Sequence, residues 1–252
     1  MSPAPPPDIR IPEHLLPSDG RFGSGPSKVR PEAVAALAAA APTYLGTSHR
    51  QAGVKSVVRR MREGLAALFD LPDGYEMVLG NGGTTLFWDM ATLCLIGRRS
   101  QHLSFGEFSS KFAAAAAAAP FLEAPEIIAS PAGTHPAPEP RADIDLYAFT
   151  HNETSTGVAM PICRPEGAPS GSLVAVDATS AAGALRVDLA EADAYYFAPQ
   201  KAFGSDGGLW IAILSPAAVE RVEVLGRAGR WVPAILDLGI ALESSRLDQT
   251  YN

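Results

Sequence analysis

The sequence predicts an α/β protein with a mostly parallel central sheet and helices on both faces. Short runs of β-branched and aromatic residues alternate along the chain with longer apolar stretches of helical spacing. The chain has 252 residues, of which 47% are hydrophobic, so it is long enough and apolar enough to bury a large core. Strands interleaved with helices are typical of a sheet covered on both faces.

The expected elements begin at residue 31, and each has its own local pattern. Apolar residues at helical spacing predict helices at 31–41, 54–70, 84–97 and 109–119. Short strand-forming runs predict strands at 75–80, 100–105, 125–130, 145–150, 172–177 and 192–198. The alanine run at 113–119 favours a packed helix, because alanine is the best helix former. The proline-rich stretch 131–140 is expected to be a connection.

Composition limits the domain organisation and the classes of function. We expect a proline-rich tail at residues 1–20 and one large domain at 21–252. No apolar run approaches the roughly 20 residues of a membrane helix, and the first residues lack a secretion signal, so the sequence predicts a cytoplasmic protein with no membrane contact. A net charge of -7 argues against binding to nucleic acid. Cys94 and Cys163 form no C-x-x-C pair, so we expect two buried thiols, with no disulfide and no metal site.

A glycine turn follows the predicted strand at 75–80. Its sequence, NGGTT at 81–85, leads into an apolar helix. Glycines let backbone N–H groups approach an anion, and a helix N-terminus adds its dipole. The turn lacks the G-K-[ST] ending of a P-loop and the G-x-G-x-x-G pattern of dinucleotide sites. A phosphate cradle and a purely structural turn therefore both remain open.

Polar residues also follow the next two buried strands. Asn152 and Thr154 come after 145–150, where they would address a ligand or build a turn. Asp177 ends a run apolar enough to be buried, and ionised carboxylates are rarely buried unless they are paired. Asp177 is equally well explained as a cap for the segment ATSAAG. Ligands of such sheets gather at the carboxyl ends of the strands.

Lys201 stands directly after a strand that Pro199 breaks, in the stretch YYFAPQKAFGSDGG. A lysine acts as a nucleophile only in an unusual environment or as part of an imine that has already formed. The phosphate cradle, the carboxylate and the lysine together match the needs of pyridoxal 5'-phosphate. Its aldehyde needs a lysine, its ring nitrogen needs a carboxylate, and its phosphate needs oriented donors. The sequence therefore predicts this cofactor.

Six segments carry a family resemblance: SGPSKV, GTSHRQ, LGNGGTT, HNETSTGV, VDATSAAG and YYFAPQKAFGSDGGLW. They resemble phosphoserine aminotransferase, particularly its actinobacterial form, from about Phe22 to the last residue. The resemblance implies the large domain of the aspartate-aminotransferase-like fold (fold type I) and a homodimer with a shared active site. It also implies conversion of 3-phosphohydroxypyruvate and L-glutamate to O-phospho-L-serine and 2-oxoglutarate. In some members the analogous hydroxythreonine phosphate of vitamin B6 synthesis is a second substrate.

The resemblance also implies roles for single residues. Lys201 would be the Schiff-base lysine, and Asp177 the partner of the ring nitrogen. Other cofactor contacts would come from Thr154 at the ring hydroxyl, Phe108 stacked on the ring, Gly83, Thr84 and Gln200 at the phosphate, and Asn252 at the phosphate bound by the other subunit. Substrate anions would be bound by His49 and Arg50. Composition alone favours a solvated charge for Arg50, and a structural role for His49 stays open.

The chain departs from many relatives at two positions, and it stops earlier. Phe108 stands where many relatives have tryptophan, and a flat ring suffices for stacking, so we expect a change in cofactor affinity more than in chemistry. The glycine turn lacks an arginine, so uncharged donors must compensate at the phosphate. Relatives continue beyond Asn252 with a smaller C-terminal domain, which we expect to be absent from this chain.

Three other functions stay open. A serine–pyruvate or alanine–glyoxylate aminotransferase would keep the lysine and the aspartate but lack cations directed at a substrate phosphate. A cysteine desulfurase needs a cysteine in a mobile polar loop, and neither Cys94 nor Cys163 lies in such a loop. A non-catalytic remnant of the fold would serve only as a dimerisation module and would not bind the cofactor.

Overall fold

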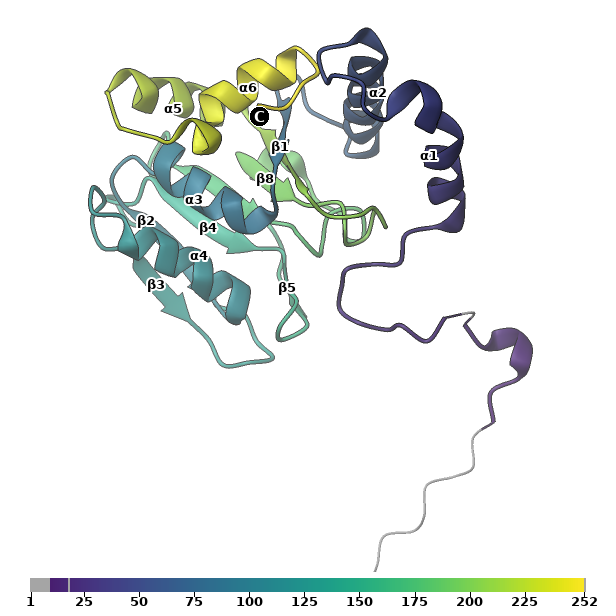
Figure 1. Ribbon diagram of the computed structural model, residues 1–252. Coiled ribbons are helices and arrows are strands. Elements are labelled where there is room, and N and C mark those ends of the chain that lie inside the picture. Colours follow the sequence, from purple (N-terminus) through teal and green to yellow (C-terminus); the bar gives the residue numbers. More distant parts are fainter. Residues whose placement is uncertain (1–9, 18, 252) are drawn as a thin grey trace, which may run out of the picture.

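The computed structural model describes residues 10–17 and 19–251 and is built around a seven-stranded sheet (Figure 1). In spatial order the strands are β1 Glu76–Asn81, β9 Leu209–Leu214, β8 Ala194–Phe197, β7 Leu173–Asp177, β4 Leu146–Thr150, β2 Ser100–Ser104 and β3 Glu126–Ala129. Strand β9 pairs antiparallel with β1 and β8, and the other neighbours are parallel. All of these strands except β9 therefore run in one direction, and their carboxyl ends meet at one edge. A separate ribbon pairs β5 Asn152–Glu153 with β6 Val158–Ala159.

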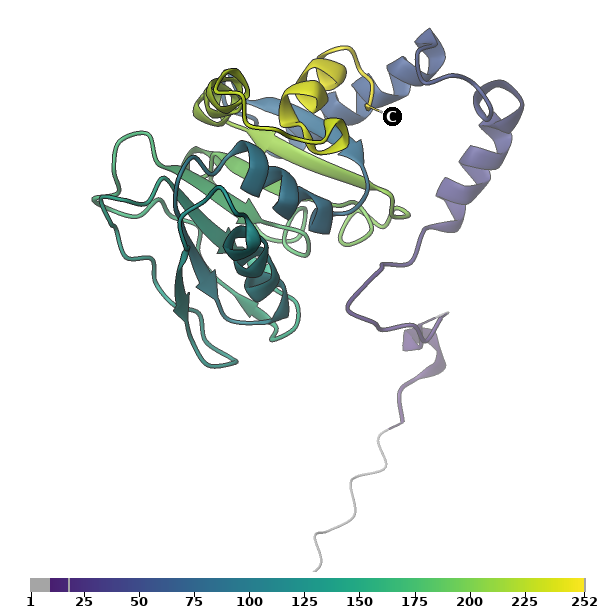
Figure 2. The same cartoon turned by 60° about the vertical axis from the view of Figure 1, so that its left-hand side comes forward.

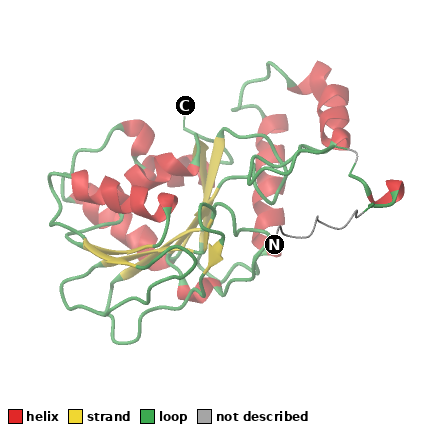
Figure 3. Cartoon of the chain, turned by 90° about the horizontal axis from the view of Figure 1, so that it is seen from below, coloured by secondary structure: helices red, strands yellow, loops and turns green. Residues whose placement is uncertain are grey.

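Helices cover both faces of the sheet, but unevenly (Figures 2 and 3). One face packs against α3 Thr84–Cys94, α4 Glu107–Ala118, α5 Pro216–Arg227, η3 Ala234–Leu236 and α6 Leu238–Arg246. The other face is closed by α2 Ala52–Leu68, by η2 Leu189–Glu191 and by loops. Tyr196 and Trp210 belong to the first core, and Tyr195 and Ile211 to the second. Neighbouring residues divide in this way because successive side chains of a strand point to opposite faces.

Helix α1, Pro31–Tyr44, lies away from the sheet and buries none of its residues (Figures 1 and 2). Its apolar side chains Val34 and Leu37 are 56% and 49% exposed. The described part of the expected tail holds one 3-10 turn, η1 Glu13–Leu15, and also extends away from the sheet. Exposed apolar surface of this kind is typical of a contact with another molecule.

Several features differ from the sequence prediction or add to it. Strand β9 and helices α5 and α6 lie beyond the elements that the sequence pattern predicts, and β9 is inserted between β1 and β8. Its sequence, LWIAIL, is apolar throughout, as in a strand covered on both faces. Cys94 is buried as expected, but the prediction for Cys163 was wrong, because this residue lies exposed in the irregular chain after β6. Among the described helices, none has the length and apolar character needed to cross a bilayer.

Candidate active site

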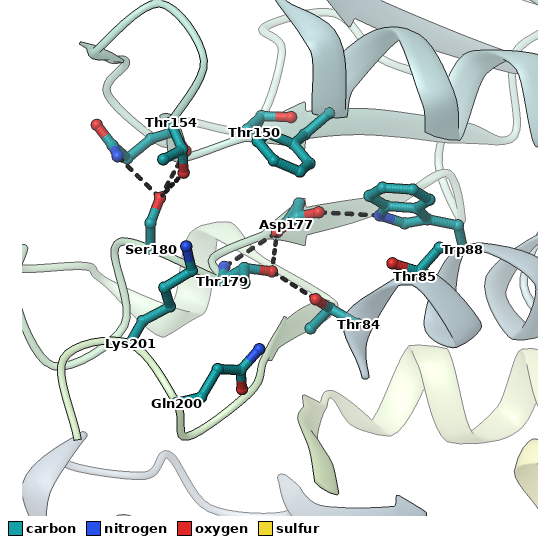
Figure 4. A pocket seen from close by; sticks show the side chains of 12 residues that line it. Thr84, Thr85, Trp88, Thr150, Thr154, Asp177, Thr179, Ser180, Gln200 and Lys201 are labelled. Carbon is teal, nitrogen blue, oxygen red and sulfur yellow. Dashed lines mark hydrogen bonds between the residues drawn. The ribbon is translucent and has the colours of Figure 1, made fainter. Parts of the chain in front are cut away.

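A pocket of about 220 Å³ lies at the edge of the sheet where the parallel strands end (Figure 4). Its walls come from the ends of β4 and β7, the loops that follow β4, β7 and β8, and the first turns of α3 and α4. The lining residues are Thr84, Thr85, Trp88, Phe108, Thr150, Asn152, Thr154, Asp177, Thr179, Ser180, Gln200 and Lys201. The pocket thus brings together seven residues that the sequence analysis singles out: Thr84, Phe108, Asn152, Thr154, Asp177, Gln200 and Lys201.

Asp177 is the last residue of β7 and is only 5% exposed. One carboxylate oxygen, Oδ2, accepts a hydrogen bond of 2.9 Å from the indole N–H of Trp88. The other, Oδ1, accepts from the backbone N–H of Thr179 at 3.0 Å and from its hydroxyl at 2.6 Å. Burial raises the pKa of Asp177, and these three hydrogen bonds oppose the rise. The hydrogen bonds therefore do not fully offset the cost of burying the charge of Asp177. A positively charged ligand in the pocket would stabilise the ionised carboxylate further.

The sequence also allows Asp177 to cap a helix, and in the structure it caps a turn instead. The segment after β7 forms turns instead of a helix, and the bond from the N–H of Thr179 to Oδ1 stabilises the first of them. The Thr179 hydroxyl has one proton, which it donates to Asp177, so it accepts the hydrogen bond that joins it to the Thr84 hydroxyl at 2.9 Å. Asp177 is thereby connected to the first residue of α3.

Ser180 joins the loop after β4 to the loop after β7. Its hydroxyl accepts hydrogen bonds of 2.8 Å from the Thr154 hydroxyl and from the Asn152 side-chain amide, and it donates to the Asn152 carbonyl at 3.0 Å. Figure 4 shows Thr154 and Ser180 facing each other beside the amine of Lys201. These hydroxyls form a polar wall that can hydrogen-bond a ring substituent.

Lys201 reaches into the pocket from the loop after β8 (Figure 4). Its Nζ donates a hydrogen bond of 2.8 Å to the carbonyl of Ser24. The next residue, Gly25, has a φ of +132°, and a Cβ placed there would lie 2.4 Å from Nζ. Only glycine accommodates both the backbone angle and the lysine. The N-terminal segment, which also donates from the N–H of Ser27 to the carbonyl of Gln200 at 2.7 Å, therefore holds the lysine loop from outside.

The glycine turn ends at the pocket as the sequence predicts, but Gly83 itself does not line it. Gly83 is the N-cap of α3, and no side chain caps this helix. The first turn, which contains Thr84 and Thr85, thus presents an uncapped helix N-terminus to the pocket. Gln200 also lines the pocket, and its side-chain NH₂ group is a further uncharged donor. Uncharged donors for an anion are therefore concentrated where the pocket meets the start of α3.

Two residues to which the resemblance gives a role in substrate binding, His49 and Arg50, do not line the pocket of this chain. His49 and Arg50 lie in the turn between α1 and α2, outside the lining, because α1 and its connection stand away from the sheet. Asn252 lies outside the described residues. Its neighbour Tyr251 accepts a hydrogen bond of 3.0 Å at its carbonyl from the Asn81 side chain, which places residue 251 beside the end of β1.

The structure adds Trp88, Thr179 and Ser180 to the residues that the sequence proposes. Thr179 and Ser180 come two and three residues after Asp177, so their polarity at a strand end was an available signal. Trp88 lies four residues after Thr84 on α3, which puts both on the same helix face. Nothing in the local sequence separates it from a core tryptophan.

The comparisons agree on one family. A family model described as aminotransferase class-V matches residues 22–233. A phosphoserine aminotransferase from Nocardioides sp. is 60% identical over 245 residues, which make up 97% of this chain and 66% of that protein. The crystal structure of a phosphoserine aminotransferase from Cytophaga hutchinsonii has a TM-score of 0.82 at 27% identity, with 90% of this chain and 64% of that chain covered.

A second solved structure supports the fold alone. It is an aspartate aminotransferase of subgroup IV from Thermus thermophilus, with a TM-score of 0.72 at 24% identity, and the match covers 90% of this chain and 63% of that chain. The chain spans 65% to 66% of the length of the curated relatives it matches. Since the family model covers well over half of its residues, the chain belongs to the class-V aminotransferase family.

Proposed function

We propose that this chain is the cofactor-binding part of a phosphoserine aminotransferase, which converts 3-phosphohydroxypyruvate and L-glutamate to O-phospho-L-serine and 2-oxoglutarate. The name of the curated relative from Nocardioides supports the choice of substrates. The observation that carries the proposal is the meeting of Lys201 and Asp177 in one pocket, after the adjacent parallel strands β8 and β7.

Class-V aminotransferases use pyridoxal 5'-phosphate, and the pocket residues fit each part of that molecule. Lys201 offers a primary amine to an aldehyde. Asp177 is a buried carboxylate with a raised pKa, which a protonated ring nitrogen would stabilise in its charged form. The uncapped start of α3 suits a phosphate, because its N–H groups and its dipole both favour an anion.

When bound, this cofactor supplies an aldehyde carbon that receives the amino group and a ring that accepts electrons from the substrate. Lys201 would hold the cofactor covalently and, once displaced by the substrate amine, remove a proton from the substrate carbon as a general base. Asp177 would keep a proton on the ring nitrogen. The other contacts would come from Thr154 at the ring hydroxyl, Phe108 against the ring face, and Thr84 and Gln200 at the phosphate.

Cations directed at the substrate phosphate distinguish this proposal from other class-V aminotransferases. Among the described lining residues, Lys201 alone is basic. We therefore propose that His49 and Arg50 act in the pocket of a second subunit, because they lie outside the pocket of their own chain. Arginine suits this task, since its planar fork forms two hydrogen bonds with a carboxylate or a phosphate.

The purified protein is expected to take up pyridoxal 5'-phosphate, which gives it a visible absorbance band, and then to prefer phosphoserine over alanine as the amino donor. The preference follows from the cations that a phosphate needs. Spectrophotometric titration followed by an assay with each donor tests both parts. Faster turnover of alanine would favour a serine–pyruvate or alanine–glyoxylate type. A protein that stays colourless would favour the non-catalytic remnant.

We further propose a homodimer in the cytoplasm, in which α1 contributes to the contact between the subunits. Val34→Glu and Leu37→Glu are expected to shift the protein toward a monomer, because each puts a charge on the exposed apolar side of α1. Val224→Glu on α5 is the matched control, since Val224 is similarly exposed at 46% but lies on another helix. Sedimentation velocity measures the outcome, and unchanged dimers in both α1 variants would contradict the proposal.

A further inference from the structure

Glu153 is a fully buried carboxylate that the proposed reaction does not use. It lies on β5 with 0% of its surface exposed. Its Oε2 accepts hydrogen bonds from the backbone N–H groups of Phe108 at 3.1 Å and Ser109 at 2.8 Å, and from the Ser109 hydroxyl at 2.9 Å. Its Oε1 accepts from the backbone N–H and the hydroxyl of Ser155 at 3.1 and 2.7 Å. The carboxylate thus joins the β5–β6 ribbon to the first turn of α4.

These bonds replace the cap that α4 lacks. The N-cap residue is Gly106, which has no side chain to bind the free N–H groups at the start of the helix. Glu153 accepts from two of these groups, and the Ser155 hydroxyl accepts from a third, the N–H of Glu107, at 2.9 Å. A negative charge at a helix N-terminus is also favoured by the helix dipole. The helix start therefore depends on the ribbon.

The close approach requires glycine on the helix side. A Cβ at position 106 would lie 2.4 Å from the Cγ of Glu153 and 2.5 Å from the Ser155 hydroxyl. Such distances are far inside van der Waals contact, so any larger residue at position 106 would push the ribbon away. Gly106 and Glu153 together fix how closely the ribbon packs on α4.

We propose that Glu153 is a positioning residue that fixes the separation of two pocket walls. One wall is the ring of Phe108, whose own N–H is bound to Glu153. Another part of the wall includes Thr154, the residue after Glu153 in the chain, whose hydroxyl is bound to Ser180. Because both walls are tied to one carboxylate, a displacement of the ribbon would change the width of the pocket. The inference rests on the proposed function, in which Phe108 contacts the face of the cofactor ring and Thr154 contacts the ring hydroxyl.

Glu153→Gln tests the inference with little change of shape. A glutamine has one acceptor oxygen, so its NH₂ group must take the place of either Oε1 or Oε2. The donors that faced that oxygen, which belong either to Ser155 or to Phe108 and Ser109, then lose their acceptor. We expect a dissociation constant for pyridoxal 5'-phosphate about tenfold higher, the size expected for a lost charge-assisted hydrogen bond. We also expect an altered visible circular dichroism of the bound cofactor, because its ring is held less firmly. Amide hydrogen exchange in the cofactor-free protein should speed up at Phe108 and Ser109.

Glu107→Gln is the matched control, because Glu107 lies in the same first turn but is exposed and pairs with Lys111 across one helical turn. It should leave the dissociation constant and the dichroism unchanged. Ser155→Ala is a milder variant, which removes the hydrogen bond from this hydroxyl to Glu153 and the one that it accepts from the N–H of Glu107. It should shift both readouts in the same direction as Glu153→Gln, and it replaces that variant as the test if Glu153→Gln does not fold. Phe108→Leu combined with Glu153→Gln should cost less than the sum of the two, since both act through one ring.

The possible outcomes separate the inference from the proposed function. Equal cofactor affinity and equal dichroism in Glu153→Gln and the unsubstituted protein would overturn the positioning role and leave the proposed function intact. If the unsubstituted protein takes up no cofactor, the proposed function is wrong, and the inference that rests on it falls as well.

Discussion

Replacing Lys201 with alanine is expected to abolish both transamination and the covalently held, coloured form of the cofactor. Lys201 is the only amine among the described residues that line the pocket, so no neighbouring side chain can form the same bond. The substitution removes the nucleophile and the general base together, which should lower turnover by roughly 10⁴-fold or more. Visible absorbance after extensive dialysis and the rate of phosphoserine formation measure the two effects.

Two further variants identify the cause of the loss. Lys201→Arg keeps the positive charge and the length but cannot form the covalent bond, so it should behave like the alanine variant. Lys28→Ala removes an exposed amine that forms an ion pair with Asp19 at 3.5 Å, and this variant should retain activity and colour. Normal turnover in Lys201→Ala would refute the proposed role of Lys201.

The sequence predicts the location of the pocket because it depends on the direction of the strands. Parallel strands end at one edge, so polar residues directly after different strands must lie close together. Asp177 ends β7, Thr154 and Lys201 follow other strands, and the pocket gathers all three residues. The spacing of these three residues along the chain does not by itself show that they lie close together. Their proximity follows only once a parallel sheet is inferred.

The contacts that hold these residues could not be predicted in the same way. Trp88 lies 89 residues from Asp177 in the sequence, and its hydrogen bond exists only because α3 packs across the end of β7. In the sequence, Glu153 is one polar residue in the polar run HNETSTG. In the structure it is fully buried and accepts hydrogen bonds from Ser109, which lies 44 positions away. Such contacts depend on how helices dock on the sheet, and no local pattern encodes that docking.

The position of the turn that contains His49 and Arg50 also could not be predicted from local sequence. Their family motif predicts a role in binding anions, but the position of the turn depends on what α1 packs against. Since α1 buries none of its residues against the described part of this chain, the sequence alone could not show that both residues lie outside the nearest pocket.

Replacing Asp177 with asparagine is expected to leave a protein that binds the cofactor but turns over slowly. Asparagine keeps the shape of aspartate but cannot stabilise a positive charge on the ring nitrogen. Loss of one partner of a buried ionic pair costs roughly 3–5 kcal/mol, so the turnover number should fall by about 10² to 10⁴-fold at saturating cofactor. Asp89→Asn, at an exposed position next to Trp88 on α3, is the control and should keep normal turnover.

Because the pKa of Asp177 is raised, Asp177→Asn should also change how the stability of the cofactor-free protein depends on pH. Burial favours the protonated carboxyl in the folded state, so the folded protein binds one more proton than the unfolded chain between the ordinary aspartate pKa of about 3.9 and the raised value. The contribution of Asp177 to the free energy of unfolding therefore falls as the pH rises through this window and is constant above it. Urea denaturation at a series of pH values should show that Asp177→Asn loses this fall, whereas Asp89→Asn keeps it. If Asp177→Asn turned over normally, the carboxylate would serve only the turn that Thr179 begins.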